Sequence, residues 1–258
     1  MKEKTKVYIA DSNGTLTFAR QPIHGEMADT LTEFAERYKF VVVTGSPWEE
    51  LVDEMPETLV HNPNVDFWCS MGNSMYRNGE NVYDSKSMID FEAFHPILED
   101  ILETCPIQYE KSFENHYEVN PHSINFTMLG RPEGGDPSIE DRLAYEKWDE
   151  EHGQRKWVIE YLTKLYPDHE MTLGGQLSID IVKKGFDKTQ IVKHYKDDYD
   201  ITFFGDRIAA MGNDNSIAHV IADIGGTIYE IEKPEETMRI MQMLMRRADK
   251  DAAAEAKA

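Results

Sequence analysis

The chain has 258 residues, of which 48 are acidic and 27 basic, so its formal net charge at pH 7 is −21. Such an excess of negative charge repels nucleic acid and anionic membrane surfaces, and we expect neither as a partner. An anionic ligand would bind this chain only where basic side chains, or a bound cation, supply local positive charge.

The short apolar runs, the charged start of the chain and the two cysteines predict a cytoplasmic protein. Apolar residues make up 40% of the chain, and none of their runs approaches the roughly 18 residues that span a membrane. The start, Met1 to Lys6, is rich in charge and leads directly into a strand-like run, which is unlike a secretory signal. The two cysteines, Cys69 and Cys105, form no metal-binding pattern, and we expect both to be reduced thiols in the core.

A strand, a helix and a second strand are predicted first, over 7–10, 27–35 and 40–43. The strands are short, apolar and partly β-branched, and apolar residues between them recur at helical spacing. This order is typical of the start of a parallel sheet. Asp11 follows the first strand directly, and ligands of open α/β sheets bind at that end of the strands. The alternative is that Asp11 and its neighbours form only a polar turn.

The elements that follow first continue the core and then, beyond residue 85, indicate a second, smaller unit. We expect helices, strands and one hairpin in this order: helix 48–55, strand 67–70, hairpin 75–83, helix 91–105, strands 117–119 and 123–128, helix 139–165 and strand 178–182. Alternating strands with two helices predict an α+β cap with an antiparallel sheet. We place this cap at 86–184, inserted into a doubly wound α/β core of 1–85 and 185–248. The tail, 249–258, is expected to be a frayed helix end.

The chain beyond the cap returns to the core. A helix is predicted over 189–195 and a buried strand over 201–204, which ends at Asp206 and is followed by Gly212-Asn213-Asp214. Carboxylates at the ends of two parallel strands, Asp11 and Asp206, favour a cation that prefers oxygen ligands, such as Mg2+. The alternative for 212–214 is again a turn.

The run Asp11-Ser12-Asn13-Gly14-Thr15-Leu16 resembles the first signature motif of the haloacid dehalogenase superfamily. The resemblance implies that Asp11 is a nucleophile that becomes an aspartyl phosphate. It also implies that the main-chain carbonyl of Asn13 joins Asp11 and Asp206 as a metal ligand. Position 13 departs from the family, which normally has an Asp there as general acid and base.

The remaining superfamily signatures occur in the expected order. Thr44, after the second strand, would hold the transferring phosphoryl group, and Lys188 would neutralise its charge and that of the nucleophile. Asp214 would complete the metal site by orienting a bound water or Lys188. The alternatives are that Thr44 caps the following helix and that Lys188 simply opens one.

Four further motifs resemble eukaryotic-type phosphomannomutases: Gly14-Thr15-Leu16-Thr17-x-x-Arg20, Asn125-x-Thr127-x-x-Gly130-Arg131, Gly174-Gly175-Gln176-Leu177-Ser178-Ile179-Asp180 and Gly185-Phe186-Asp187-Lys188. The resemblance implies that a set of polar side chains binds a hexose phosphate: Arg20, Ser46, Asn120, Arg131, Arg142, Ser178 and Asp180. Arginine forks suit a phosphate dianion. Asn120 stands where the family has an Arg, and 132–137 is a short insertion.

Each of these side chains also has a simpler interpretation. Arg20 could be an ordinary surface arginine, and Arg131 and Arg142 could form salt bridges in an acidic helical region. Ser178 and Asp180, which lie on one face of a strand, could be its exposed polar face. The combination of motifs in order favours the hexose phosphate site over these separate alternatives.

The resemblance implies interconversion of mannose 6-phosphate and mannose 1-phosphate, with Mg2+ as cofactor and a hexose bisphosphate as activator. It also implies a homodimer formed through the cap. Two alternatives remain open. One is a phosphosugar phosphatase, in which water takes the phosphoryl group from Asp11. The other is a non-catalytic sugar-phosphate binding protein, which Asn13 supports.

Overall fold

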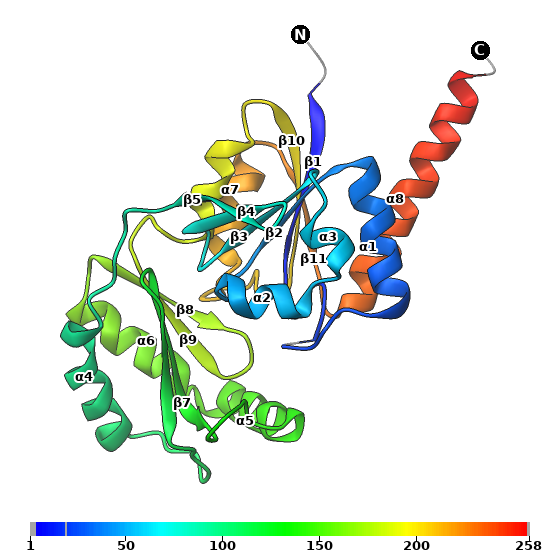
Figure 1. The fold of residues 1–258 in the computed structure, drawn as a ribbon. Coiled ribbons are helices and arrows are strands. Elements are labelled where there is room, and N and C mark those ends of the chain that lie inside the picture. The colour runs from blue at the N-terminus through cyan, green and yellow to red at the C-terminus, as the bar shows by residue number, and fades with distance from the viewer. Residues whose placement is uncertain (1–3, 19, 257–258) are drawn as a thin grey trace.

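Two β-sheets organise the computed structural model, which describes residues 4–18 and 20–256 (Figure 1). The larger sheet has the order β11-β10-β1-β2-β3-β4-β5. Its strands are β1 (Thr5–Asp11), β2 (Lys39–Val43), β3 (Val65–Cys69), β4 (Ser74–Arg77), β5 (Glu80–Asp84), β10 (Tyr199–Gly205) and β11 (Thr227–Glu230). The strands from β11 to β3 run parallel, and β4 and β5 form an antiparallel hairpin.

The sheet is doubly wound around β1. The chain builds β2 and β3 on one side of β1 and returns later to build β10 and β11 on the other side. Ligands of such sheets bind where the winding direction changes, beyond the carboxyl ends of the strands. Here that place lies beyond the ends of β1 and β10.

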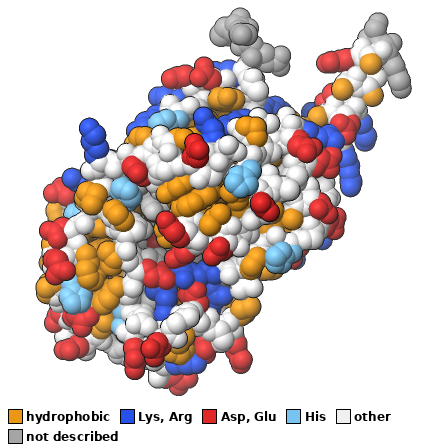
Figure 2. All heavy atoms as spheres, in the orientation of Figure 1, with side chains coloured by type: hydrophobic (Ala, Val, Ile, Leu, Met, Phe, Trp, Pro, Cys, Tyr) orange, Lys and Arg blue, Asp and Glu red, His pale blue; other side chains and the backbone are white. Residues whose placement is uncertain are grey.

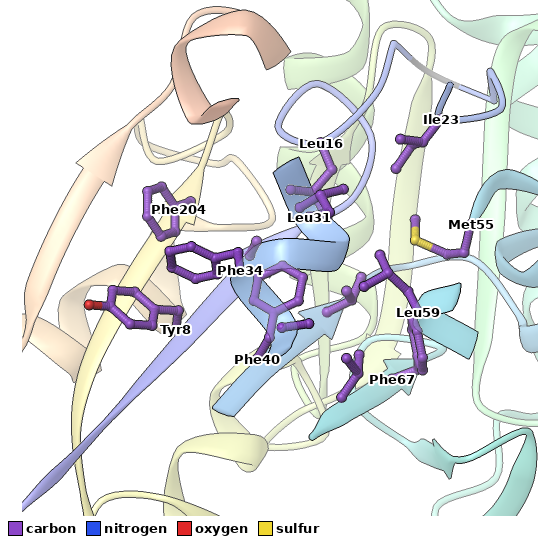
Figure 3. Packing of buried hydrophobic residues seen from close by; sticks show 14 of the residues in the cluster. Tyr8, Leu16, Ile23, Leu31, Phe34, Phe40, Met55, Leu59, Phe67 and Phe204 are labelled. Carbon is purple, nitrogen blue, oxygen red and sulfur yellow. The ribbon is translucent and has the colours of Figure 1, made fainter. Parts of the chain in front are cut away.

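Both faces of the sheet are covered, which explains why β1 is a continuous apolar run. Tyr8 and Ala10 face a cluster that includes residues of α1 (Gly25–Arg37), α2 (Trp48–Glu54), α3 (Glu57–Val60) and α8 (Pro234–Glu255), part of which Figure 3 shows. Val7 and Ile9 face the opposite cluster, with residues of α7 (Asn215–Asp223) and the 3-10 helix η1 (Lys188–His194). Alternate residues of β1 thus fill two separate cores.

The smaller sheet is antiparallel and has the order β6-β7-β9-β8. Its strands are β6 (Asn115–Val119), β7 (Ser123–Arg131), β8 (His169–Gly174) and β9 (Ser178–Lys183), and the helices beside it are α4 (Phe91–Thr104), α5 (Ile139–His152) and α6 (Gln154–Leu165). Ile179 and Ile181 of β9 belong to a core cluster that includes residues of α4 and α6. Ser178 and Asp180 alternate with them and therefore face the other way, toward the larger sheet.

Backbone hydrogen bonds join the two parts of the molecule. The N–H of Leu173, in β8, donates to the carbonyl of Met211 at 2.7 Å, and the N–H of Asn213 donates to the carbonyl of Leu173 at 3.3 Å. The loop after β10 therefore extends the edge of the smaller sheet. Figure 2 shows basic and acidic side chains gathered in the hollow between the two parts.

The predicted α/β fold is confirmed, and several elements differ from expectation. The helix expected over 139–165 is two helices, because Gly153 adopts a left-handed conformation at φ 74° and ends α5. The elements β8, β11 and α7 were not predicted, and the helix expected at 189–195 is a 3-10 helix. The tail, which was predicted to be the end of a helix, forms the end of α8 as far as Glu255.

The boundaries of the two parts follow from where their strands lie. The larger sheet takes strands from 5–84 and 199–230, and the smaller sheet takes strands from 115–183. We therefore propose to keep the division into a core of 1–85 and 185–248, a cap of 86–184 and a tail of 249–258. Within the described residues, no helix is long and apolar enough to cross a membrane.

Candidate active site

A buried lysine lies at the centre of the site. The Nζ of Lys188 donates to Oδ1 of Asp11 at 2.6 Å and to Oδ1 of Asp214 at 2.7 Å. Lys188 and Asp214 are completely buried, and Asp11 is nearly so. Burial disfavours the charged ammonium, but the two neighbouring carboxylates outweigh it and raise the pKa of Lys188. The ammonium therefore stays charged and holds the end of β1 and the start of α7 together.

The carboxylate of Asp206 adds a third acidic group beside Lys188, Asp11 and Asp214, so negative charge is in excess there. Oxygens of Asp11, Asp206 and Asp214 lie within 4.8 Å of one another. Burial raises the pKa of Asp11 well above its usual range, against the opposing effect of Lys188. Burial and the charge of Asp214 raise the pKa of Asp206 to about 6. Three carboxylates against one ammonium form an oxygen-rich site that fits a divalent cation such as Mg2+.

Gly14 allows this close approach of the first loop to Asp206. Its φ is +93°, and a Cβ at this position would lie 2.4 Å from Oδ2 of Asp206. A larger residue would therefore clash with the carboxylate and strain the turn. The close contact with Asp206 therefore requires glycine at position 14, in addition to the tendency of glycine to form turns.

Asn13 fixes the loop that leads to Arg20. Its Oδ1 accepts a hydrogen bond from the backbone N–H of Arg20 at 2.6 Å, and Arg20 adopts the left-handed conformation at φ 58°. Asn13 also lines the same cavity as Asp11. Its carboxamide is thus positioned beside the nucleophile candidate, but an amide cannot exchange a proton as a carboxyl group does.

Thr44 and Ser46 lie in the loop after β2 and line the cavity together with Asp11. The Oγ1 of Thr44 accepts a hydrogen bond from the N–H of Ser46 at 3.2 Å. The alternative role of Thr44 as a helix cap is wrong, because α2 begins after Pro47 and has no side-chain cap. The hydroxyl of Thr44 can still donate to an anion in the cavity, whereas the N–H groups of Thr44 and Ser46 already have partners.

Polar side chains of the cap form a connected network opposite Asp11. The Nη2 of Arg131 donates to Asn125, whose Nδ2 donates to Asp180, both at 2.6 Å. The Nδ2 of Asn213, from the core, donates to the other oxygen of Asp180 at 3.1 Å. Burial raises the pKa of Asp180. The hydroxyl of Ser178 donates to the carbonyl of Gly174 at 2.9 Å, so it is already held by the backbone.

The cavity that these side chains enclose has a volume of about 180 Å³ and lies between core and cap. Predicted site residues that line it are Asp11, Asn13, Arg20, Thr44, Ser46, Asn120, Arg131, Arg142, Ser178 and Asp180. Lys188, Asp206 and Asp214 are not among its lining residues and connect to it through Asp11. The structure thus brings together residues that are widely separated in the sequence.

Asn120 lines the cavity, but its side chain is engaged in a turn. Its Oδ1 accepts hydrogen bonds from the N–H groups of His122 and Ser123, each at 2.9 Å, and its Nδ2 donates to Oγ of Ser123 at 2.7 Å. These bonds close the hairpin between β6 and β7. A carboxamide held in this way has little freedom to bind a ligand.

Sequence reasoning missed several charged residues of the cavity wall: Glu50, Glu118, Asp136 and Arg207. Arg207 forms ion pairs with Glu146 of the cap and, at 3.4 Å, with Asp206. Its position directly after Asp206 was a usable signal. No sequence feature distinguished Glu50, Glu118 and Asp136, because a chain with 48 acidic side chains offers many similar candidates.

The doubly wound sheet, the acidic cluster at its strand ends and the inserted second sheet define a haloacid dehalogenase-like fold. A haloacid dehalogenase-like hydrolase from Bacteroides thetaiotaomicron superposes with a TM-score of 0.56 at 13% identity, covering 93% of this chain and 100% of that one. A structure described as a trehalose-6-phosphate phosphatase related protein gives 0.57 at 15% identity, covering 95% and 100%. At these identities the likeness shows the fold.

The sequence places the chain more narrowly. The family profile for eukaryotic phosphomannomutase matches residues 27–247, so the chain belongs to the eukaryotic phosphomannomutase family. The phosphomannomutase of Saccharomyces cerevisiae is 29% identical over 252 residues, covering 94% of this chain and 96% of the relative. A probable phosphomannomutase of Caenorhabditis elegans is 28% identical over 255 residues, with the same coverage of each chain.

Removal of one carboxylate should weaken cation binding at the acidic cluster. In Asp206→Asn, one negative charge is lost from a site whose affinity depends on ligand charge. We expect the Mg2+ dissociation constant, measured by titration calorimetry, to rise at least about 10-fold. The control is Asp223→Asn, because Asp223 is exposed at the end of α7. Equal Mg2+ affinity in Asp206→Asn and the unmodified chain would show that the cluster does not bind the ion.

A buried glutamate beneath the site should make stability depend on pH. Glu54 is 5% exposed, accepts a hydrogen bond from Ser12 at 3.4 Å, and burial raises its pKa from about 4.5 to about 7. The folded state then keeps a proton that the unfolded chain loses, so the contribution of Glu54 to stability falls as pH rises from about 4.5 to about 7.

Glu54→Gln removes this titration. The unfolding free energy of the variant, relative to the unmodified chain, should therefore increase with pH over that range by at most about 3 kcal/mol. Urea unfolding at pH 5, 6, 7 and 8 measures the difference. Glu57→Gln, at an exposed position in the next helix, is the control. A difference that is the same at pH 5 and pH 8 would contradict the expectation.

Proposed function

We propose that this chain is a phosphomannomutase that transfers a phosphoryl group between the 6- and 1-positions of a hexose through Asp11. The observation that carries the proposal is the arrangement of the cavity. Asp11 lines the core side, and Arg131 and Arg142 line the cap side. A hexose with a phosphate at either end fits such a site, because one phosphate can meet the nucleophile while the other meets guanidinium groups.

The sugar would lie between these two ends. Asp180 and Asn125 already share a hydrogen bond, and both face the cavity. Carboxylate and carboxamide groups on one face of a sheet can accept and donate hydrogen bonds to ring hydroxyls. Neither group prefers one end of the sugar, which suits an enzyme that must bind the hexose in both orientations.

Bond making and breaking would occur at Asp11. With a phosphoryl group on Asp11, the free hydroxyl of the bound hexose phosphate would attack that phosphorus. The bond from phosphorus to the Asp11 oxygen would break, and the hydroxyl proton would pass to water. Lys188 orients Asp11 and opposes the rise in its pKa that burial causes, and the hydroxyl of Thr44 is placed to donate to a phosphoryl oxygen. The hexose bisphosphate so formed would turn around, and a carboxylate oxygen of Asp11 would attack its other phosphorus. The bond from that phosphorus to the sugar oxygen would break, the sugar oxygen would take a proton from water, and the isomer would leave.

The acidic cluster would hold Mg2+ through Asp11, Asp206 and Asp214, together with the main-chain carbonyl of Asn13. When bound, the ion supplies positive charge that offsets the charge of the phosphoryl group. The residues fit this role because their negative charge exceeds what Lys188 balances. A hexose bisphosphate would serve as activator, because it can phosphorylate Asp11 before the first turnover. We further propose that the protein is cytoplasmic and that its caps form a homodimer.

Asn13 is the one residue that argues for slow chemistry. It occupies the position at which a proton must reach or leave the sugar oxygen, and its carboxamide cannot perform that transfer. This observation supports a second candidate, a sugar-phosphate binding protein with little turnover. A phosphosugar phosphatase is the enzymatic alternative, and release of free phosphate in place of the isomer would identify it.

Asn13→Asp should raise the rate of hexose phosphate turnover by roughly 10²–10⁴, the usual contribution of a positioned acid and base. The substitution keeps the fold of the loop, because a carboxylate oxygen can accept the same hydrogen bond from Arg20. Formation of the isomer and release of phosphate are measured in parallel. Asn81→Asp, exposed and outside the cavity lining, is the control with the same chemical change.

An unchanged rate in Asn13→Asp would contradict the role assigned to position 13. A second measurement tests Asp11 independently of that role. Acetyl phosphate has a good leaving group and needs little acid, so it should add a phosphoryl group to Asp11 in the unmodified chain when Mg2+ is present. If mass spectrometry finds no Mg2+-dependent adduct at Asp11, the phosphoryl-transfer proposal fails.

A further inference from the structure

Four charged side chains form a closed ring at the edge of the cavity: Arg20, Arg131, Glu118 and Asp136. Arg20 donates to Glu118 at 2.6 Å and to Asp136 at 2.8 Å. Arg131 lies 3.0 Å from the same oxygen of Glu118 and 3.3 Å from Asp136. Two carboxylates thus lie between two guanidinium groups, and the ring carries no net charge.

The contacts of Arg131 in this ring are incomplete. Arg131 is 6% exposed, and within the described part of the chain its Nε and Nη1 have no hydrogen-bond partner. Asp136 lies within ion-pair distance of Nε but is not aligned for a hydrogen bond with it. Buried donors without partners are costly, so a ligand with more acceptor oxygens would bind better here than a carboxylate does.

The two acidic members of the ring differ in how firmly they are held. Glu118 lies within β6, where its backbone pairs with Asn125. Asp136 lies in the connection 132–137 between β7 and α5, beside Gly134 and Gly135, neither of which has other atoms within 4 Å of its Cβ position. Asp136 can therefore move away from the arginines together with this connection, whereas the backbone of Glu118 is held in the sheet.

We propose that Asp136 occupies the position of the substrate's distal phosphate, the one that does not face Asp11, on Arg20 and Arg131. Asp136 would then compete with that phosphate. Asp136 is then a specificity-determining residue. A phosphate dianion, with three oxygens and up to two charges, can replace it and satisfy Nε and Nη1 of Arg131. A singly charged anion gains too little to do so. The inference rests on the proposed function only in assigning the distal phosphate to these arginines.

The competition should be visible in the binding of inorganic phosphate. The apparent affinity of a ligand falls by the fraction of protein in which its site is free. Removal of the charge in Asp136→Asn weakens the internal contact, which is partly exposed. We expect the dissociation constant of phosphate to fall about 5- to 10-fold at low salt. Calorimetry without Mg2+ favours this site, because the uncompensated acidic cluster repels phosphate from the core side.

A double-mutant cycle separates direct competition from a general effect of charge. In Arg131→Ala, phosphate binding should weaken, and adding Asp136→Asn should then bring a smaller gain, because only Arg20 is left for Asp136 to release. Glu133→Gln removes one charge from the same connection at an exposed position and should leave the dissociation constant unchanged. Asp136→Ala serves as a second variant, and thermal unfolding confirms that each variant is folded.

Three results would overturn the proposal: an unchanged dissociation constant in both Asp136 variants, an equal gain in Glu133→Gln, or a gain that is undiminished in the Arg131→Ala background. None of these measurements requires turnover. Tighter phosphate binding in Asp136→Asn would therefore support the inference even if Asp11 accepted no phosphoryl group. A phosphorylated Asp11 with unchanged phosphate binding would sink the inference and leave the proposed function intact.

Discussion

The two ion pairs of Lys188 with Asp11 and Asp214 are the interactions on which the rest of the site depends. They connect β1, η1 and the start of α7 at the point where the sheet changes its winding direction. All three groups are buried, so removing Lys188 would leave two carboxylates without their counter-charge, and breaking a buried ion pair in this way typically costs about 3–5 kcal/mol. The same contacts therefore place the nucleophile candidate and stabilise the fold around it.

A strongly acidic chain can bind an anionic ligand because four arginines line one cavity. Arg20, Arg131, Arg142 and Arg207 all line it, although the chain as a whole carries a charge of −21. Five carboxylates from core and cap also line it and offset this positive charge, as the ring with Glu118 shows. Low dielectric inside the cavity strengthens each of these contacts relative to the surface. Affinity for an anion is thus set by the balance of charges within the cavity, against a repulsive background.

The sequence predicted those parts of the structure that depend on local patterns. The apolar run of β1 and the glycine after it are readable because burial on two faces and a turn at φ +93° each demand particular residues. The break at Gly153 was missed because both flanking segments have helical spacing. Glu54 and Asp136 were missed for another reason. Their significance arises from the packing of α2 under β1 and of the cap on the core, which no local pattern records.

The hydrogen bond between Asn13 and Arg20 separates two functions of position 13. One is positional: the side-chain oxygen accepts a hydrogen bond from the backbone N–H of Arg20 and thereby holds Arg20 in place. The guanidinium group of Arg20 can then reach Glu118 and Asp136. An amide performs this function as well as a carboxylate does. The other is proton transfer, which an amide cannot perform. Because the first function is retained in this chain, the arginine ring stays assembled, and the presence of Asn at this position acts on the rate of chemistry with little effect on the shape of the cavity.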